Sequence, residues 1–147
     1  MQRDLVERAM VGDREAFTEL GGLWIDRLYV IARLILRDDE LAEDATQEAL
    51  IAAWRDVAGL RDPDRFDSWL RSLLVHACYR EARRGRRRRI IEAQVEPAAA
   101  HWMDPSSGLA DRDELERLLG RLSPEQRALV VLHYYLGLPL QETALAL

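Results

Sequence analysis

The stretch LWIDRLYVIARLIL, residues 23–36, decides how this chain folds. Its apolar residues fall on nearly every side of a helix, and the only charged residues among them are Asp26, Arg27 and Arg33. A helix that is apolar almost all round is buried by its neighbours on several sides. The stretch therefore predicts a central core helix against which the rest of the chain packs.

Helical periodicity extends from this stretch in both directions, and no segment shows the strict alternation of a half-buried strand. Gly12-Asp13 ends a first helix and caps the next, and Gly21-Gly22 is expected to interrupt that second helix. These signals predict an all-α protein. Before residue 90, the expected helices cover residues 4–10, 14–20, 23–36, 39–57 and 65–84.

Residues 90–110 differ in character, because prolines, alanines, serines and a glycine replace the helical pattern. Helical periodicity then resumes, and the SPEQ sequence that begins at Ser123 is typical of a helix start, with serine at the N-cap and glutamine three residues later. We therefore predict two small helical domains, 1–89 and 111–147, joined by a linker over 90–110.

Length and composition set further bounds. The 147 residues leave room for one ordinary domain or two small ones, and the apolar share of 48% favours folded structure. The single cysteine, Cys78, cannot form an internal disulfide, and neither a signal-peptide pattern nor a membrane-length apolar run occurs. We expect a cytoplasmic protein with no membrane insertion.

The charges are unevenly distributed along the chain. The net charge is −5, from 26 acidic residues against 21 basic ones, all of which are arginine. This balance by itself argues against binding to DNA phosphates. However, residues 38–54 carry six acids and no base, whereas residues 71–91 carry eight arginines and one acid. Like charge at this density indicates either an interaction surface or a solvated segment.

The acidic helix expected over 39–57 has a polar stripe between two faces of small and apolar residues. At helical spacing, one aliphatic side chain lies among the polar ones of this stripe. Such a strip suits contact with a protein partner, although a solvated face with one exposed isoleucine is the more frequent case. The stripe consists of Asp44, Gln47, Glu48, Ile51 and Arg55.

The helix expected over 65–84 has an apolar face, which includes Trp69, opposite a basic one. Guanidinium groups pair with phosphates and flat rings stack on exposed bases, so basic residues interleaved with an aromatic ring predict contact with nucleic acid. The candidate DNA-binding residues on this face and in the arginine run that follows are His76, Tyr79, Arg80, Arg83, Arg84, Arg86 and Arg87.

Four motifs follow one another along the chain: GDREAFTEL at 12–20, AEDATQEA at 42–49, FDSWL at 66–70 and LSPEQR at 122–127. In this order they resemble the sigma-70 family of bacterial transcription initiation factors, and within it the small extracytoplasmic-function (ECF) group. The first three resemble parts of the family's region 2, and the third, with the arginine run, resembles the segment that reads the −10 promoter element. The last resembles the start of region 4.

The resemblance implies a factor that binds core RNA polymerase and directs it to promoters by recognising and melting the −10 element. Asp44, Gln47, Glu48 and Ile51 would dock on the clamp helices of the largest polymerase subunit. The basic helix would capture bases flipped out of promoter DNA, at a cost recovered by a shaped pocket and by phosphate contacts. An anti-sigma factor is a further partner that such proteins can have.

The sequence also departs from the family pattern. His76 and Arg80 stand where the family often has an asparagine and an acid, which bears on the choice of −10 bases. Region 4 normally continues into a recognition helix that enters the major groove of the −35 element. Residues 111–147 are expected to form only part of this helix-turn-helix, without the recognition helix.

Two other classes of function fit parts of the sequence. A sigma-like interaction protein, or a truncated factor, would carry the same motifs and bind polymerase or an anti-sigma factor without initiating transcription. An all-α enzyme would need a cluster of catalytic groups, yet the three histidines and Cys78 lack zinc-ligand spacing and no glycine-rich phosphate loop occurs. We therefore expect a non-enzymatic protein with no metal site and no cofactor.

Overall fold

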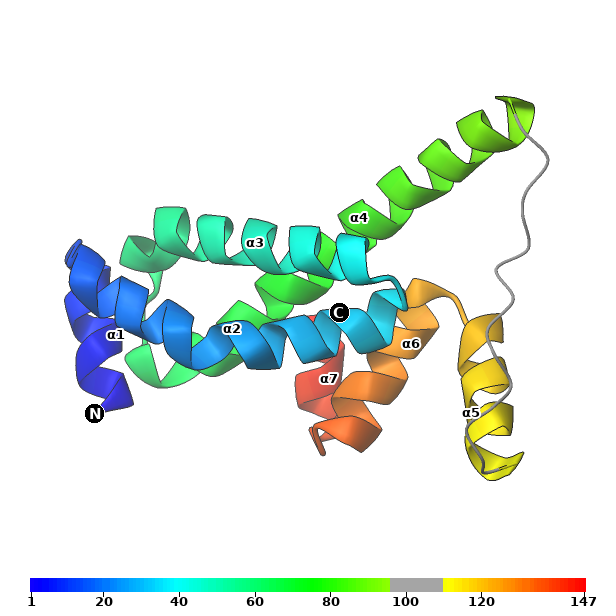
Figure 1. Cartoon of the computed structure of the whole chain (residues 1–147). Helices are drawn as coiled ribbons and strands as arrows, with labels where there is room; N and C mark the ends of the chain where they lie inside the picture. Colours follow the sequence, from blue (N-terminus) through cyan, green and yellow to red (C-terminus); the bar gives the residue numbers. More distant parts are fainter. Residues whose placement is uncertain (96–109) are drawn as a thin grey trace.

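The computed structural model describes residues 1–95 and 110–147, and every regular element in these ranges is helical (Figure 1). The prediction of an all-α protein is confirmed. None of the described helices is both long and apolar enough to cross a bilayer. The elements are α1 (Gln2–Met10), α2 (Arg14–Leu36), α3 (Asp39–Asp56), α4 (Phe66–Val95), α5 (Ala110–Arg121), α6 (Pro124–Val130) and α7 (Leu140–Ala146), with 3₁₀ turns at Val57–Gly59 and Pro63–Arg65 and a π-helical turn at Val131–Tyr135.

Helix α2 is the central element of the fold, as its sequence predicts. Asp13 caps its start, because the carboxylate accepts hydrogen bonds from the backbone N–H groups of Glu15 and Ala16. Leu28 and Ile35 of α2 are completely buried. Helices α1, α3, α4 and α6 all pack against it, so α2 belongs to the core along most of its length.

The expected break at Gly21-Gly22 is wrong, because α2 continues without interruption from Arg14 to Leu36. Each glycine costs a helix about 1 kcal/mol relative to alanine. Leu20 and Trp24 flank the pair and are buried, and burial of one such side chain contributes about 1.5–3 kcal/mol. Core packing on both sides therefore offsets the low helix propensity of the two glycines.

Small residues line the surface through which α3 packs against α2 and α4. Four alanines of α3 are completely buried, and Leu41 lies so close to α4 that a Cβ at Gly85 would be 2.9 Å from its Cδ1 atom. Small side chains allow helix backbones to approach closely. We call this set the alanine seam, and it consists of Ala42, Ala45, Ala49 and Ala53 with Gly85.

Helix α4 is longer than its sequence predicts. The pattern indicates an end near residue 84 and a linker from residue 90, whereas α4 includes the whole arginine run and ends at Val95. The helix can continue past the arginine run because Ile90, Ile91 and Glu92 do not break helices, and the next proline is Pro97. Most of the expected linker, residues 96–109, lies outside the described residues, and the domain boundaries stay a prediction.

The C-terminal helices pack on the first part of the chain. Helix α6 contacts α2 and α4, and α7 contacts α4 (Figure 1). Ala128, Leu132 and Ala146 are buried in the same core cluster as Leu28 and Leu74. The capping box predicted at Ser123 is present, with reciprocal hydrogen bonds between Ser123 and Gln126.

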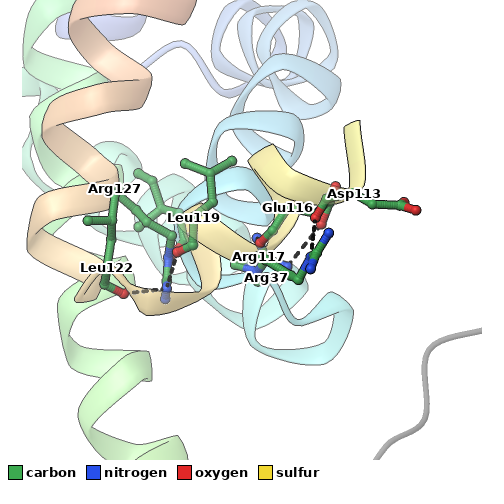
Figure 2. Close-up of polar contacts among 8 residues, drawn as sticks. Arg37, Asp113, Glu116, Arg117, Leu119, Leu122 and Arg127 are labelled. Atoms are coloured by element: carbon green, nitrogen blue, oxygen red, sulfur yellow. Dashed lines mark hydrogen bonds and ion pairs between the residues drawn. The ribbon is translucent and has the colours of Figure 1, made fainter. Parts of the chain in front are cut away.

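A buried guanidinium at Arg127 joins three helices. Its Nε donates to the carbonyl oxygen of Ile35 at the end of α2 (2.5 Å), and its Nη1 donates to the carbonyls of Leu119 (3.2 Å) and Leu122 (2.7 Å) near the end of α5 (Figure 2). Burial lowers the pKa of the Arg127 guanidinium from its ordinary value. The last carbonyls of a helix have no hydrogen-bond donor within that helix. The Arg127 side chain donates to three carbonyls at or next to helix ends.

A second contact joins α2 and α5 nearer the surface. Arg37, in the left-handed conformation that ends α2 (φ 56°), donates to the backbone carbonyl of Glu116 and to its carboxylate, both at 2.9 Å (Figure 2). Arg37 and Arg127 thus fix α5 and α6 beside the end of α2.

Cys78 provides a direct test of this packing. It is completely buried in α4, and burial raises the pKa of its thiol to about 12. Only the thiolate reacts with disulfide reagents. We expect a thiol reagent at pH 8 to label the native protein only as fast as the core opens, and to label the guanidinium-unfolded protein at once. Rapid labelling of the native protein would contradict the position of Cys78 in the core.

Candidate functional site

A groove of about 750 Å³ lies along α2 and α3. Asp44, Gln47 and Ile51, three members of the predicted protein-binding stripe, line it. All three are exposed, and Ile51 exposes 62% of its surface. An aliphatic side chain presented among polar ones on a groove wall provides both shape and charge for a partner.

Aromatic side chains shape part of the same groove. Trp54 and Phe17 both line it, with their ring centroids 5.1 Å apart, and Trp54 remains 38% exposed. Trp54 is not among the predicted site residues. Its position at i+3 from Ile51 on the same helix is the signal that could have found it.

The groove is also acidic. Asp26 of α2 and Glu43 of α3 line it together with Asp44. Neither Asp26 nor Glu43 is among the predicted site residues. An apolar floor between carboxylates favours a partner helix that carries basic side chains around an apolar one.

The structure separates Glu48 from Asp44, Gln47 and Ile51, the three stripe residues that line the groove. Its Oε1 accepts a hydrogen bond from Arg80 Nε at 2.7 Å, and its Oε2 lies 3.9 Å from Arg84 Nη1. Glu48 therefore faces α4 instead of the groove. This pairing brings Glu48, a predicted protein-binding residue, into contact with Arg80 and Arg84, two predicted DNA-binding residues.

Glu81, the one acid in the basic segment 71–91, is buried beneath the same arginines. The residue is 4% exposed, and its Oε1 lies 2.5 Å from Arg84 Nη1. Burial raises the pKa of the Glu81 carboxyl, whereas the neighbouring Arg84 lowers it. Glu81 is not among the predicted site residues, although its spacing of three residues from Arg84 indicates an ion pair.

The remaining predicted DNA-binding residues lie along α4. Arg83, Arg84, Arg86 and Arg87 are all exposed. His76 is exposed as well, and its Nε2 lies 3.3 Å from the carbonyl oxygen of Leu147, next to α7. The α4 helix therefore presents a row of exposed guanidinium groups.

Tyr79 lies close to His76, with the two ring centroids 6.4 Å apart. The Tyr79 side chain packs against the core, and burial raises the pKa of its phenol to about 12. Trp69 also packs against the core, in ring contact with Phe66 at 5.9 Å between centroids, as the sequence predicts.

Within the described residues, no group of three or more histidine, cysteine or acidic side chains is arranged to hold a metal ion.

Two protein families match successive parts of the chain. The sigma-70 region 2 family matches residues 23–88, and the sigma-70 region 4 family matches residues 112–147. The first range holds the groove-lining residues other than Phe17, together with the arginines of α4 up to Arg88. The second range holds α6 and α7.

Individual relatives point to the same family. Over 142 residues the chain is 32% identical to the ECF RNA polymerase sigma factor SigM of Mycobacterium tuberculosis, covering 96% of this chain and 70% of the relative. It is 32% identical over 143 residues to the ECF RNA polymerase sigma factor SigK of a Mycobacterium species, covering 92% and 72%. It is 25% identical over 155 residues to the RNA polymerase sigma-H factor of Pseudomonas aeruginosa, covering 97% and 80%.

The helical fold and these matches show that the chain belongs to the sigma-70 family of RNA polymerase sigma factors, within its ECF group. It is a transcription initiation factor that directs RNA polymerase to promoters. The resemblance seen in its sequence motifs is thereby confirmed.

Proposed function

We propose that the groove of α2 and α3 binds the clamp helices of the largest polymerase subunit, and that α4 recognises and melts the −10 element. The observation that carries the proposal is the division of charge between two neighbouring surfaces. The groove is acidic around an exposed Ile51, whereas α4 presents a row of exposed arginines. An acidic groove suits a basic protein surface, and a row of arginines suits the phosphates of DNA.

The groove supports the first part of the proposal through its shape. Ile51 and Trp54 provide partly exposed apolar surface between carboxylates, and a buried apolar anchor inside a polar rim is the usual composition of a protein interface. Asp44 and Gln47 then belong to the rim. Glu48, which pairs with Arg80, contributes from the α4 side instead.

The arginine row supports the second part. Arg80, Arg83, Arg84 and Arg87 recur at spacings of three and four residues, so they share one face of α4. A helix that presents four guanidinium groups on one face can follow the phosphates of a strand while a nearby ring stacks on a base. His76 and Tyr79 are the ring-bearing candidates at the start of this row. The protein would act on promoter DNA in the cytoplasm. Residues 1–89 and 111–147 would form its two domains. An anti-sigma factor would be a further partner.

Replacement of Arg83 and Arg87 by alanine tests the DNA part. Holoenzyme formed with this variant should bind a forked −10 DNA probe more weakly. The slope of log affinity against log salt should decrease by about 0.7–0.9 for each lost contact, since each phosphate contact releases about that many counterions. Binding is measured by fluorescence anisotropy over a range of salt concentrations.

The matched control replaces Arg14 and Arg112, which are exposed and lie away from α4. This control removes the same charge and should leave the slope unchanged. An equal change in both variants would contradict a DNA-binding role for α4.

Core enzyme that gains no promoter-specific initiation on addition of the wild-type chain would favour the alternative, an interaction protein that occupies polymerase or an anti-sigma factor.

A further inference from the structure

Two carboxylates lie beneath the arginine row, one on each of two helices. Glu48 comes from α3 and Glu81 from α4. Arg80 Nε is 2.7 Å from Glu48 Oε1, and Arg84 Nη1 is 2.5 Å from Glu81 Oε1 and 3.9 Å from Glu48 Oε2. The four side chains form a continuous cluster of two acids and two bases, which we call the Glu48–Glu81 cluster.

The two acids are far less accessible than the arginines they hold. The Glu81 side chain is 5% exposed and the Glu48 side chain 30%, whereas Arg80 and Arg84 expose 43% and 64%. Glu48 Oε2 is itself buried, with no hydrogen-bond partner among the described residues. A buried carboxylate is unfavourable unless a cation compensates it. The acids are therefore placed to hold the arginines from below.

This arrangement leaves part of each guanidinium available to another ligand. A guanidinium carries five N–H donors in a planar fork, and these hydrogen bonds use only Nε of Arg80 and Nη1 of Arg84. Arg80 and Arg84 are exposed on the same face of α4 as Arg83 and Arg87. A side chain fixed before binding loses less conformational freedom when the ligand arrives.

We propose that Glu48 and Glu81 are positioning residues, which fix Arg80 and Arg84 in the orientation that binds the phosphates of promoter DNA. The inference rests on the proposed function of α4. It also makes α3, which carries the groove, a contributor to the DNA-binding surface through Glu48.

Positioning and simple electrostatics predict opposite results for removal of one acid. If Glu81 acts only through its charge, then Glu81→Gln makes the surface more positive and should strengthen DNA binding. If Glu81 positions Arg84, the same substitution should weaken binding, because the guanidinium loses its anchor. We expect the affinity of Glu81→Gln holoenzyme for the forked −10 probe to decrease about fivefold, which corresponds to one immobilised side chain.

Glu40→Gln is the matched control. Glu40 also lies on α3 and also contacts an arginine of α4, since its Oε1 is 3.4 Å from Arg88 Nη1, but both side chains are well exposed, at 74% and 60%. The control makes the same change in charge without removing a buried anchor. We expect it to leave probe affinity equal to that of the wild type or slightly above it.

A double-variant comparison links the effect to Arg84. In an Arg84→Ala background, Glu81→Gln should have no further effect on probe affinity, since the side chain that it positions is gone. Thermal unfolding and affinity for core polymerase, measured for each variant, show that the fold is retained. Should Glu81→Gln not fold, Glu48→Gln, measured as holoenzyme at saturating core, tests Arg80 in the same way.

The outcomes separate this inference from the proposed function. Stronger binding by Glu81→Gln, as in the Glu40→Gln control, would overturn the positioning role while α4 remains the DNA-binding helix. An additive loss in the Arg84→Ala background would overturn it as well. Unchanged probe affinity on replacement of Arg83 and Arg87 would instead contradict the proposed function itself.

Discussion

Replacement of Asp44 by arginine is expected to reduce binding to core polymerase more than a hundredfold and to abolish promoter-specific initiation at limiting protein. Asp44 is exposed on the wall of the groove, in a row of carboxylates with Asp26 and Glu43. An acidic wall suits a partner that presents basic side chains, and Asp44→Arg would place a like charge against such a partner. Like charges brought together in an interface cost several kcal/mol, and each 1.4 kcal/mol corresponds to a tenfold change in affinity.

The fold should tolerate this change, because surface substitutions away from packing and caps alter stability by no more than about 0.5 kcal/mol. Glu19→Arg is the matched control. It makes the same charge reversal at an exposed position of α2 outside the groove lining and should retain binding. Binding to core is measured by fluorescence, and initiation by transcription from a promoter template. Equal losses in both variants, or full binding by Asp44→Arg, would show that the groove is not the docking surface.

Replacement of Arg127 by alanine is expected to destabilise the packing of α5 and α6 on α2 by about 3 kcal/mol. Hydrogen bonds from a charged donor contribute roughly 1.5–3 kcal/mol each, and the cost of burying the guanidinium offsets part of that sum. The variant also leaves the carbonyl oxygens of Ile35, Leu119 and Leu122 without this donor. Urea unfolding, followed by tryptophan fluorescence and by proteolysis within α6, measures the loss.

Arg121→Ala serves as the control for this prediction, because Arg121 is an exposed arginine at the end of α5. Its loss should change stability by no more than about 0.5 kcal/mol. Arg127→Ala with unchanged stability and unchanged cleavage within α6 would mean that the three carbonyl contacts contribute nothing to the packing of these helices.

The sequence was sufficient to predict the helical class, the central position of residues 23–36 and the cap at Ser123, because each depends on local patterns. The break predicted at Gly21-Gly22 was wrong, since tertiary burial of Leu20 and Trp24 outweighs a local preference. The burial of Arg127 could not be predicted from the sequence. It follows a strong helix start and looks like one more surface arginine, and only the approach of α2 makes it a buried donor.

The candidate site was predictable only in part for the same reason. Helical spacing places Asp44, Gln47 and Ile51 on one stripe, and the structure does put all three in one groove. The same spacing assigns Glu48 to that stripe, yet its side chain turns to Arg80, 32 positions further along the chain. Pairings across helices depend on how the helices pack, which periodicity within one helix does not encode.

The alanine seam has a mechanical consequence. Long side chains between two helices can change rotamer and let the helices shift, whereas buried alanines have no rotamers to change, and the notch at Gly85 holds Leu41 in register. Helices α3 and α4 are therefore expected to move as one rigid unit. In the proposed complex, this rigidity would keep the separation constant between the groove, where polymerase would dock, and the arginine row, where DNA would bind.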